Sequence, residues 1–489
     1  MASRGLRAGM SIDTLFLFSS ETIRRPFTRQ CCRVVQHSRL FGASYSTRLS
    51  PNAPDLIKWI RDEGGFVHQG LRLDNEGSSG LGLLSSRVIA KGTEIISLPR
   101  HIPLALPPLD SGPDHPDALL IDLARRLPEE LWTLRLGLKL LGERAKVGSF
   151  WWPYISNLPQ AFNVPIFFSR EEIGNLQYIP LIHQVNKRCK LLLGFEAVVK
   201  SVIENLVSEQ HPFGGQDVDA AALGWAMSAV STRAFRLHGH VMSDGKRGST
   251  PMLLPLIDMC NHDFHANARI VQEADSGSDR TLVKVVAEEK IEEGESILLN
   301  YGSLTNDLLL LDYGFIVPEN QHDYVELKYD ELLLDAAAIT AGVQCTAFAS
   351  PAPWQQEFLS QLNFHGDNSN SRVILGGPEM VDGRLVAALR ILFAEDSESI
   401  KKHGLNTLQS LTVEAPLGVP NESNVLRTIV ALCVIALGHF PTQILEDETI
   451  LRKEGNSEAL KLAIAFRLSK KELLIKVMKT LTQKVKSLR

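Results

Sequence analysis

The stretch DMCNH at residues 258–262 follows an apolar run at residues 252–257, and the tripeptide NYG stands further along at residues 300–302. An apolar run that ends in polar side chains brings them to the edge of a core, where unpaired polar groups cost free energy. The second stretch predicts a tyrosine hydroxyl at the end of another strand, beside a glycine that permits close backbone approach. Either stretch alone also fits a turn or a core tyrosine. Together they predict a binding site between two strand ends.

Length, composition and charge restrict the class of protein. The chain has 489 residues, so we expect two or three domains. A hydrophobic fraction of 44% and a charged fraction of 22% are typical of a globular protein. The formal net charge of -5 argues against a general nucleic-acid binder, because binding to phosphates needs a basic surface. The longest apolar stretch beyond the first fifty residues, 429–437, is about half the length of a membrane span and predicts a buried helix.

The cysteines predict neither a disulfide framework nor a metal site. None of the 6 cysteines has CxxC spacing: Cys31 and Cys32 stand in the first fifty residues, and the other four are widely scattered, which fits reduced thiols in an intracellular compartment. Cys260, His262 and His265 stand close together, but a fourth ligand is not evident nearby. We therefore expect no metal ion.

The first fifty residues differ from the rest of the chain. They contain many arginines and serines, no lysine, and only the acids Asp13 and Glu21. This is the composition of an organellar transit peptide, with an ordinary disordered N-terminus as the alternative. The sequence RLF at residues 39–41 fits a mitochondrial processing context, although plastid peptides share the serine-rich, acid-poor character. We predict an organellar protein, with the mitochondrion favoured over the chloroplast.

Strand and helix signals divide the remainder. A capped helix is predicted at residues 55–60, and strands at 80–84, 95–99, 252–256, 281–286 and 296–300. Helical periodicity covers residues 119–228, with Leu131, Leu134, Leu138 and Leu141 on one face. After about residue 325 the chain is predicted to be helical, with helices at 384–395 and 425–437 and a last helix near the C-terminus. We expect the lysines of that last helix to form a solvated face: Lys470, Lys471, Lys476, Lys479, Lys484 and Lys486.

Five motifs in one order carry a resemblance to a known family. They are GLGL at 80–83, SFWWPYISNLP at 149–159, TRAFR at 232–236, DMCNH at 258–262 and NYG at 300–302. This series resembles the Rubisco large-subunit methyltransferase group of the SET-domain family, which also contains a branch that methylates a histidine of actin. The resemblance is close over residues 55–320, and later residues resemble the group's C-terminal domain only in kind.

The resemblance implies a fold of the α+β class. We expect a leader over residues 1–50 and a SET domain over 51–320, with a helical insertion at about 119–228. An all-α substrate-binding domain of the Rubisco methyltransferase kind is expected over 321–489.

The resemblance also implies transfer of a methyl group from S-adenosylmethionine to a protein side chain. The residues that would bind the cofactor are Ser79, Gly80, Leu81, Arg233, Asn261, His262 and Tyr301. Those that would bind the substrate are Arg233, Phe235, Asp258 and Tyr313. Tyr301 would be the catalytic residue, at the channel through which the methyl group passes. An arginine fork suits the carboxylate of the cofactor, and the transfer itself needs mainly alignment and exclusion of water.

Two features of the sequence favour lysine as the acceptor. The histidine-modifying branch carries an asparagine two residues after the arginine of the cofactor site, whereas this chain has Phe235, as lysine enzymes do. Tyr313 resembles the tyrosine of the lysine site, and aromatic walls suit an aliphatic stem. A protein-histidine methyltransferase is the alternative. Ser79 stands where relatives have glutamate, and Leu237 where a second arginine is expected, so a catalytically silent binding module is a further alternative.

The expected partner is a non-histone protein substrate. We expect no nucleic-acid or membrane partner, and a monomeric chain.

Overall fold

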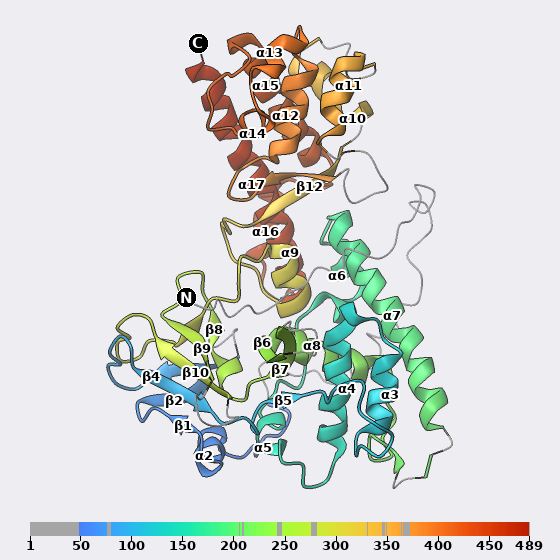
Figure 1. The fold of residues 1–489 in the computed structure, drawn as a ribbon, viewed down its shortest axis with the longest axis vertical. Coiled ribbons are helices and arrows are strands. Elements are labelled where there is room, and N and C mark those ends of the chain that lie inside the picture. Colours follow the sequence, from blue (N-terminus) through green and yellow to red (C-terminus); the bar gives the residue numbers. More distant parts are fainter. Residues whose placement is uncertain are drawn as a thin grey trace.

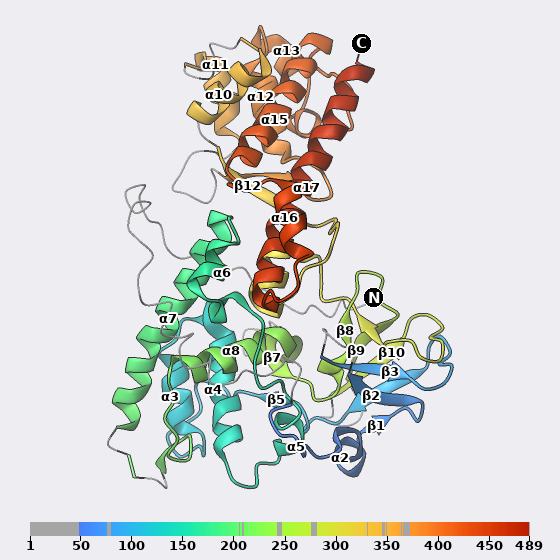
Figure 2. The same cartoon turned by 180° about the vertical axis from the view of Figure 1, so that it is seen from behind.

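The computed structural model describes residues 48–75, 80–204, 206–207, 210–241, 247–274, 281–329, 331–344, 348, 350–362, 364 and 372–488. The predicted leader lies outside these residues as far as residue 47, and so does Ser79. Figure 1 shows an elongated molecule with most of its strands and a group of helices at one end and the C-terminal helices at the other. Figure 2 shows from behind that one long helix connects the two ends.

The N-terminal region is built on short strands in three sheets. The strands are β1 (Phe66–Val67), β2 (Leu71–Asn75), β3 (Leu81–Ser85), β4 (Glu94–Leu98), β5 (Leu104–Ala105), β6 (Ala234–Val241), β7 (Arg247–Leu253), β8 (Asn261–His262), β9 (Ala268–Ala274), β10 (Thr281–Ala287) and β11 (Leu298–Leu299). Six of them form one sheet in the order β1-β4-β10-β9-β11-β8, while β2 pairs with β3, and β7 lies between β5 and β6. The predicted strands at 80–84 and 95–99 are thus confirmed, and they belong to different sheets.

Side-chain alternation explains how the six-stranded sheet is covered. In β10, Val283, Val285 and Ala287 are buried while Lys284 is only partly buried, as expected when successive residues point to opposite faces. Antiparallel pairing with β9 runs from Thr281↔Ala274 to Ala287↔Ala268. At the far side β11 and β8 run parallel, with Leu298 opposite Asn261 and Leu299 opposite His262. This register places the two stretches that opened the sequence analysis side by side.

The helical insertion is confirmed between β5 and β6. Its helices are α3 (Ala118–Arg125), α4 (Trp132–Ala145), α5 (Trp152–Ile155), α6 (Arg170–Gly174), α7 (Ile179–Ile203) and α8 (Ala220–Arg233), with the 3₁₀ turns Glu129–Leu131 and Pro165–Phe167. The predicted stripe of Leu131, Leu134, Leu138 and Leu141 is buried throughout. Ahead of the sheet, α2 (Leu56–Asp62) begins at Asp55, whose carboxylate accepts hydrogen bonds from the backbone N–H of Ile57 and Lys58 at 3.0 and 3.1 Å.

The strand predicted at 252–256 is wrong at its end. β7 stops at Leu253, and the chain turns at Leu256, whose φ of 70° is unusual for a residue with a side chain. A 3₁₀ turn, Ile257–Met259, follows. The error has a physical reason: a short apolar run looks the same in sequence whether it is a buried strand or a buried turn.

After residue 302 the chain is mainly helical. Its elements are α9 (Asn306–Leu308), the π-helical turn η7 (Leu309–Tyr313), β12 (Tyr324–Lys328), α10 (Glu331–Ala341), α11 (Pro353–Ser360), β13 (Arg372–Gly376), α12 (Gly383–Leu392), α13 (Ser397–Lys401), α14 (Leu405–Gln409), α15 (Val419–Gly438), α16 (Ile444–Leu451) and α17 (Glu458–Ser487). The antiparallel pair β12–β13 was not predicted, because each strand is short and its partner is far away in sequence.

α15 is the only helix among the described residues with the length and apolar composition of a membrane span. It packs against α10, α12 and α17, and 56% of its apolar window is buried. The buried residues Val425, Leu426, Ile429 and Leu432 make it a core helix of the C-terminal region.

The expectation of a solvated lysine face on the last helix is wrong at two positions. Lys470 and Lys471 of α17 have exposed fractions of 0% and 2%. Lys470 Nζ contacts Asp307, and lies 2.8 Å from Asp323 Oδ1 and 2.7 Å from Tyr324 O. Lys471 Nζ lies 2.5 Å from Asp447 Oδ2. The sequence could not show this burial, because the carboxylates around Lys470 stand far away along the chain.

Candidate functional site

The parallel pairing of β8 with β11 sets the geometry of the site. Because Leu299 lies opposite His262, Tyr301 emerges next to the imidazole, with ring centroids 4.9 Å apart. The backbone N–H of Tyr301 donates to His262 Nδ1 at 3.2 Å. The phenolic hydroxyl of Tyr301 donates to Cys260 O at 2.7 Å. The DMCNH stretch at 258–262 and the NYG stretch at 300–302 therefore hold each other in place.

One cavity of about 1080 Å³ adjoins these side chains. The predicted site residues that line it are Gly80, Leu81, Arg233, Asp258, Asn261, His262, Tyr301 and Tyr313. Phe235 is buried, with an exposed fraction of 3%, and is not among the residues that line the cavity. Ser79 cannot be placed, because it lies outside the described residues.

Arg233 ends α8 and is held at the cavity by the DMCNH stretch. Its Nη1 donates to Asp258 O at 3.1 Å and lies 3.3 Å from Met259 Sδ. Its Nε is buried and has no hydrogen-bond partner among the described residues. A guanidinium with donor capacity left over inside a cavity suits a carboxylate ligand.

The side chain of Asp258 is anchored away from open solvent. Asp258 has an exposed fraction of 3%, and its carboxylate accepts a hydrogen bond from the hydroxyl of Tyr154 on α5. Tyr154 is fully buried. Tyr154 lies in the motif at 149–159, and no role is predicted for it from the sequence. Only the fold brings the two residues together.

Aromatic rings form one wall of the cavity. The ring centroids of Tyr301 and Tyr313 lie 5.3 Å apart, and those of Tyr313 and Phe315 lie 6.1 Å apart. The ring centroids of Phe315 and His262 lie 6.2 Å apart. These rings surround a space suited to an aliphatic stem or a cation. Phe315 is an addition to the predicted residues, and its position in the same stretch as Tyr313 was the available signal.

Gly314 makes this wall possible. It has a φ of +78°, and a Cβ at this position would lie 2.6 Å from Asn163 O. Any residue with a side chain would therefore be strained in its backbone and would also clash with its surroundings at this position. The sharp change of direction after η7 lets Tyr313 and Phe315, on either side of the glycine, both line the cavity.

Gly80 provides an open stretch of backbone. Its φ is +77°, and no atom lies within 4 Å of the position that a Cβ would occupy. Together with Leu81 it lines the cavity at the start of β3. A ligand can approach such backbone closely.

Several cavity residues were not predicted. Arg48 lines the cavity from the segment that follows the undescribed N-terminus, where Leu49 N donates to Leu158 O at 2.7 Å. Asn157 and Asn163 come from the insertion. α17 contributes Glu458, Lys461, Leu462 and Ala465. Asn157 lies in the motif at 149–159, but no local pattern marks the others, because their contacts span most of the chain.

A buried ionic cluster fixes α17 beside the aromatic wall. Lys470 on α17 reaches Asp307 at the start of α9 and Asp323 before β12. Burial raises the pKa of Asp307 to about 6, although the neighbouring Lys470 opposes this shift. Burial alone would lower the pKa of Lys470, yet the two carboxylates hold it above its ordinary value. The cluster therefore ties the C-terminal helix to the segment that leads from Tyr301 to Tyr313.

Comparisons with known proteins agree with this architecture. The SET-domain family matches residues 80–302, and the Rubisco LSMT substrate-binding family matches residues 347–474. The chain is similar to the actin-histidine N-methyltransferase of Homo sapiens, with 27% identity over 450 residues that cover 87% of this chain and 68% of the relative. The enzyme of the same name from Mus musculus is 28% identical over 439 residues, covering 87% of this chain and 68% of the relative.

Solved structures of LSMT share the fold. The SET domain of LSMT bound to lysine and AdoHcy superimposes with a TM-score of 0.59 at 20% identity, covering 88% of this chain and 91% of that one. Rubisco LSMT bound to AdoMet gives a TM-score of 0.57 at 20% identity, covering 89% of this chain and 93% of that one.

Proposed function

The chain belongs to the SET-domain protein methyltransferases with a Rubisco LSMT substrate-binding domain, and from this premise we propose that it methylates a lysine side chain of a protein substrate. The observation that carries the proposal is the single cavity shared by Arg233, Asn261, His262 and Tyr301. These side chains come from α8, β8 and the end of β11, and the parallel pairing of β8 and β11 brings them together.

The cavity fits S-adenosylmethionine, the cofactor of this family. Arg233 lines the cavity with a guanidinium that suits the amino-acid carboxylate, and Gly80 and Leu81 line it as well, with open space in front of the Gly80 backbone. Asn261 and His262 line the same cavity with polar side chains. When bound, S-adenosylmethionine supplies a methyl group on a sulfonium cation.

Tyr301 contributes to methyl transfer through the fixed position of its phenolic oxygen. Its hydroxyl donates its proton to Cys260 O, which fixes the phenolic oxygen in place, and the lone pairs of such an oxygen can accept weak CH contacts. Its exposed fraction of 5% keeps bulk water away from the oxygen. A fixed acceptor in a site with little water stabilises positive charge without reorganisation during the reaction. The residues thus align and desolvate the acceptor, and no general base is needed.

The aromatic wall supports lysine as the acceptor. Tyr301, Tyr313 and Phe315 surround the end of the cavity with rings, which bind an aliphatic stem and an amine. Desolvation among these rings lowers the pKa of a lysine amine and so favours its reactive neutral form. Phe235, which also favoured lysine in the sequence, adds no contact, because it does not line the cavity.

Histidine is the second candidate acceptor, and one finding favours it. Relatives aligned over 87% of this chain are named actin-histidine N-methyltransferases. An imidazole acceptor needs hydrogen-bond partners, and Asn157 and Asn163 line the cavity with buried side-chain oxygens that have no partner among the described residues. The nature of the methylated residue therefore decides between the two proposals.

The test combines cofactor binding with analysis of the product. Calorimetry of the full chain with S-adenosylmethionine is expected to show binding. Labelled methyl transfer into an organelle extract, followed by mass spectrometry of the labelled protein, is expected to give methyl-lysine. Methyl-histidine would overturn the lysine proposal and support the alternative. Binding without any transfer would mean a silent binding module.

Tyr301→Phe provides the matched variant for this test. Loss of the hydroxyl is expected to lower kcat about 100-fold while cofactor binding remains, since a single well-placed polar group contributes about this factor. Tyr329→Phe is the control, because Tyr329 stacks on Phe364 with centroids 4.0 Å apart and does not line the cavity. Equal activity of Tyr301→Phe and wild type would contradict the catalytic role.

We further propose that the protein acts in an organelle, with the mitochondrion favoured, on a non-histone substrate. The composition of the first fifty residues supports this proposal. A full-length chain tagged at its C-terminus is expected to localise to mitochondria. Nuclear localisation would instead support a chromatin substrate.

A further inference from the structure

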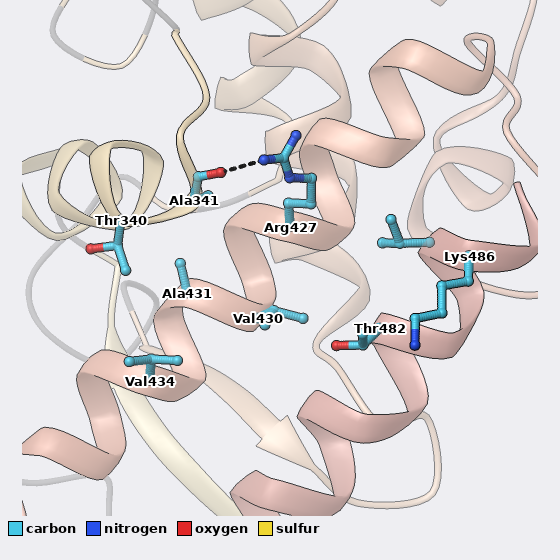
Figure 3. A pocket seen from close by; sticks show the side chains of 9 residues that line it. Thr340, Ala341, Arg427, Val430, Ala431, Val434, Thr482 and Lys486 are labelled. Carbon is cyan, nitrogen blue, oxygen red and sulfur yellow. Dashed lines mark hydrogen bonds between the residues drawn. The ribbon is translucent and has the colours of Figure 1, made fainter. Parts of the chain in front are cut away.

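A second, separate cavity lies in the C-terminal region. It has a volume of about 420 Å³ and lies between α10, α15 and α17 (Figure 3). We call it the C-terminal groove; its lining residues are Thr340, Ala341, Arg427, Val430, Ala431, Val434, Thr482, Val485 and Lys486. None of them lines the cavity of the candidate active site.

The groove has an apolar floor formed by one face of α15. Val430, Ala431 and Val434 follow Arg427 at intervals of three, four and seven residues, so all four lie on the same face of the helix. Val434 has an exposed fraction of 43%. An apolar side chain that is exposed within a hollow has no partner inside the chain and marks a contact site.

α10 also carries exposed apolar side chains. Leu332 and Ile339 each have an exposed fraction of 79% and stand seven residues apart, on one face of the helix. Ile339 directly precedes Thr340, which lines the groove. The lining residues of α15 run from Arg427 to Val434, about two helical turns, which suits a helical partner better than a small ligand.

The charged groups of the groove are all positive. Arg427 lies on one side, with Nη2 donating to Ala341 O at 2.8 Å, and Lys486 lies on the other (Figure 3). No acid is among the residues that line the groove, although Asp335 on α10, Glu422 on α15 and Glu472 on α17 belong to the same three helices. Lys476 and Lys479 on α17 are exposed but do not line the groove. The charge complement is an acidic partner.

We propose that the C-terminal groove docks an acidic amphipathic helix of the protein substrate. Apolar side chains at helical spacing would enter the floor, and flanking carboxylates would pair with Arg427 and Lys486. A nucleic acid is disfavoured, because two groove cations over an apolar floor do not match a row of phosphates. This inference rests on the proposed function, since it names the docking partner of the same substrate.

A synthetic peptide provides the probe for direct binding. The peptide is a labelled helix with leucines at intervals of three and four residues and glutamates elsewhere, and fluorescence anisotropy measures its affinity for the full chain. Arg427→Glu combined with Lys486→Glu is expected to weaken binding at least 10-fold. Lys476→Glu combined with Lys479→Glu makes the same charge change outside the groove and is expected to weaken it less than 3-fold.

Two further comparisons separate the groove from general electrostatics. A peptide of the same composition with scrambled leucines is expected to bind at least 10-fold more weakly. Val434→Glu places an acid on the floor at an exposed position, where folding tolerates it, and is expected to weaken binding at least 10-fold. Equal loss in the control double variant, equal binding of the scrambled peptide, or tighter binding of an oligonucleotide or an anionic vesicle would overturn the proposal.

Methyl transfer distinguishes failure of docking from failure of the proposed function. The groove variants are expected to bind S-adenosylmethionine as wild type does, and to lower kcat/KM at least 10-fold for the protein labelled in the extract. Unchanged kcat/KM would overturn the docking role. Absence of cofactor binding and of transfer in wild type would instead overturn the proposed function, while peptide binding would still report on the groove.

Discussion

Arg233 combines a fixed position with unused donor capacity. Its guanidinium is held by Asp258 O, and Nε has no partner among the described residues. Lysine at this position keeps the charge but loses the fork that binds both oxygens of a carboxylate. Arg233→Lys is therefore expected to weaken binding of S-adenosylmethionine about 10-fold, which corresponds to about 1.4 kcal/mol.

Calorimetry measures this change, and Arg236→Lys is the matched control. Arg236 lies three residues away, with its guanidinium 4.8 Å from the ring centroid of Trp132, and does not line the cavity. A similar loss of affinity in both variants would contradict the assigned role of Arg233.

Gly314 is required by both its backbone and its surroundings. Gly314→Ala would place a Cβ 2.6 Å from Asn163 O while keeping a φ of +78°. We expect a loss of stability of about 2 kcal/mol and at least a 10-fold loss of activity, because the aromatic wall must shift. Gly294→Ala is the control, since Gly294 has a φ of +87° but open space around it. Denaturant unfolding and methyl transfer measure both effects; equal results for the two variants would refute the steric argument.

α17 contributes residues to both the active-site cavity and the C-terminal groove, and Lys470 in its middle anchors it to Asp307 and Asp323. Lys470→Met removes one cation and leaves the partly buried Asp307 and the buried Asp323 without it. The expected loss of stability is about 3 kcal/mol, as for other broken buried ion pairs. Lys479→Met on the same helix is exposed and is expected to change stability by less than about 0.5 kcal/mol. Denaturant unfolding of both variants measures the difference, and a loss below about 1 kcal/mol for Lys470→Met would contradict the structural role.

The ionic cluster around Lys470 makes the free energy of unfolding depend on pH, because Asp307 titrates within it. Its pKa is raised from 3.8 to about 6 in the folded protein, so the folded state holds the proton more tightly than the unfolded state between these values. Stability therefore falls as pH rises from about 4 to about 6 and is then constant. Between pH 5 and 7.5, wild type is expected to lose on the order of 1 kcal/mol more stability than Asp307→Asn. Urea unfolding at both pH values measures this, and parallel profiles would contradict the assignment.

The sequence predicted those elements whose signal is a local period or motif. The leucine stripe of α4 and the polar residues at β8 and β11 were recognisable because period and motif are local properties. The burial of Lys470 and Lys471 was not recognisable, since a lysine is judged solvated until its distant carboxylates are placed. The turn at Leu256 was missed for a related reason: buried packing, which a single sequence does not display, stabilises its strained φ.

At the scale of the whole molecule, the N-terminal segment belongs to the folded body. Leu49 N and Ser50 N donate to Leu158 O and Ser156 O at 2.7 and 3.1 Å, and Arg48 lines the active-site cavity. A chain that begins at residue 48 keeps these contacts and is the reference for stability and cofactor affinity. A chain that begins at residue 52 is expected to lose about 2 kcal/mol, because each hydrogen bond contributes about 1 kcal/mol. Thermal unfolding and calorimetry compare the two; identical behaviour would contradict the role of this segment.

Much of the large-scale organisation followed from motif order, but the active-site wall contributed by α17 did not. Glu458, Lys461, Leu462 and Ala465 reach the cavity only because the chain returns to its N-terminal region after the C-terminal helices. Contacts over such a separation leave no periodicity in the sequence. The same return explains why Arg467 on α17 donates to Asn175 O at 2.8 Å, next to α6 in the insertion.

α17 also sets a length scale. Lys461 faces the active-site cavity and Lys486 the C-terminal groove, and 25 residues of straight helix span about 38 Å. Because one helix connects the two sites, their separation is fixed. Under the docking proposal, a substrate must carry its target side chain and its acidic helix at a comparable distance on its folded surface. Selectivity would then depend on the three-dimensional shape of the substrate, and a short peptide around the target residue would be modified poorly however well its own sequence fits.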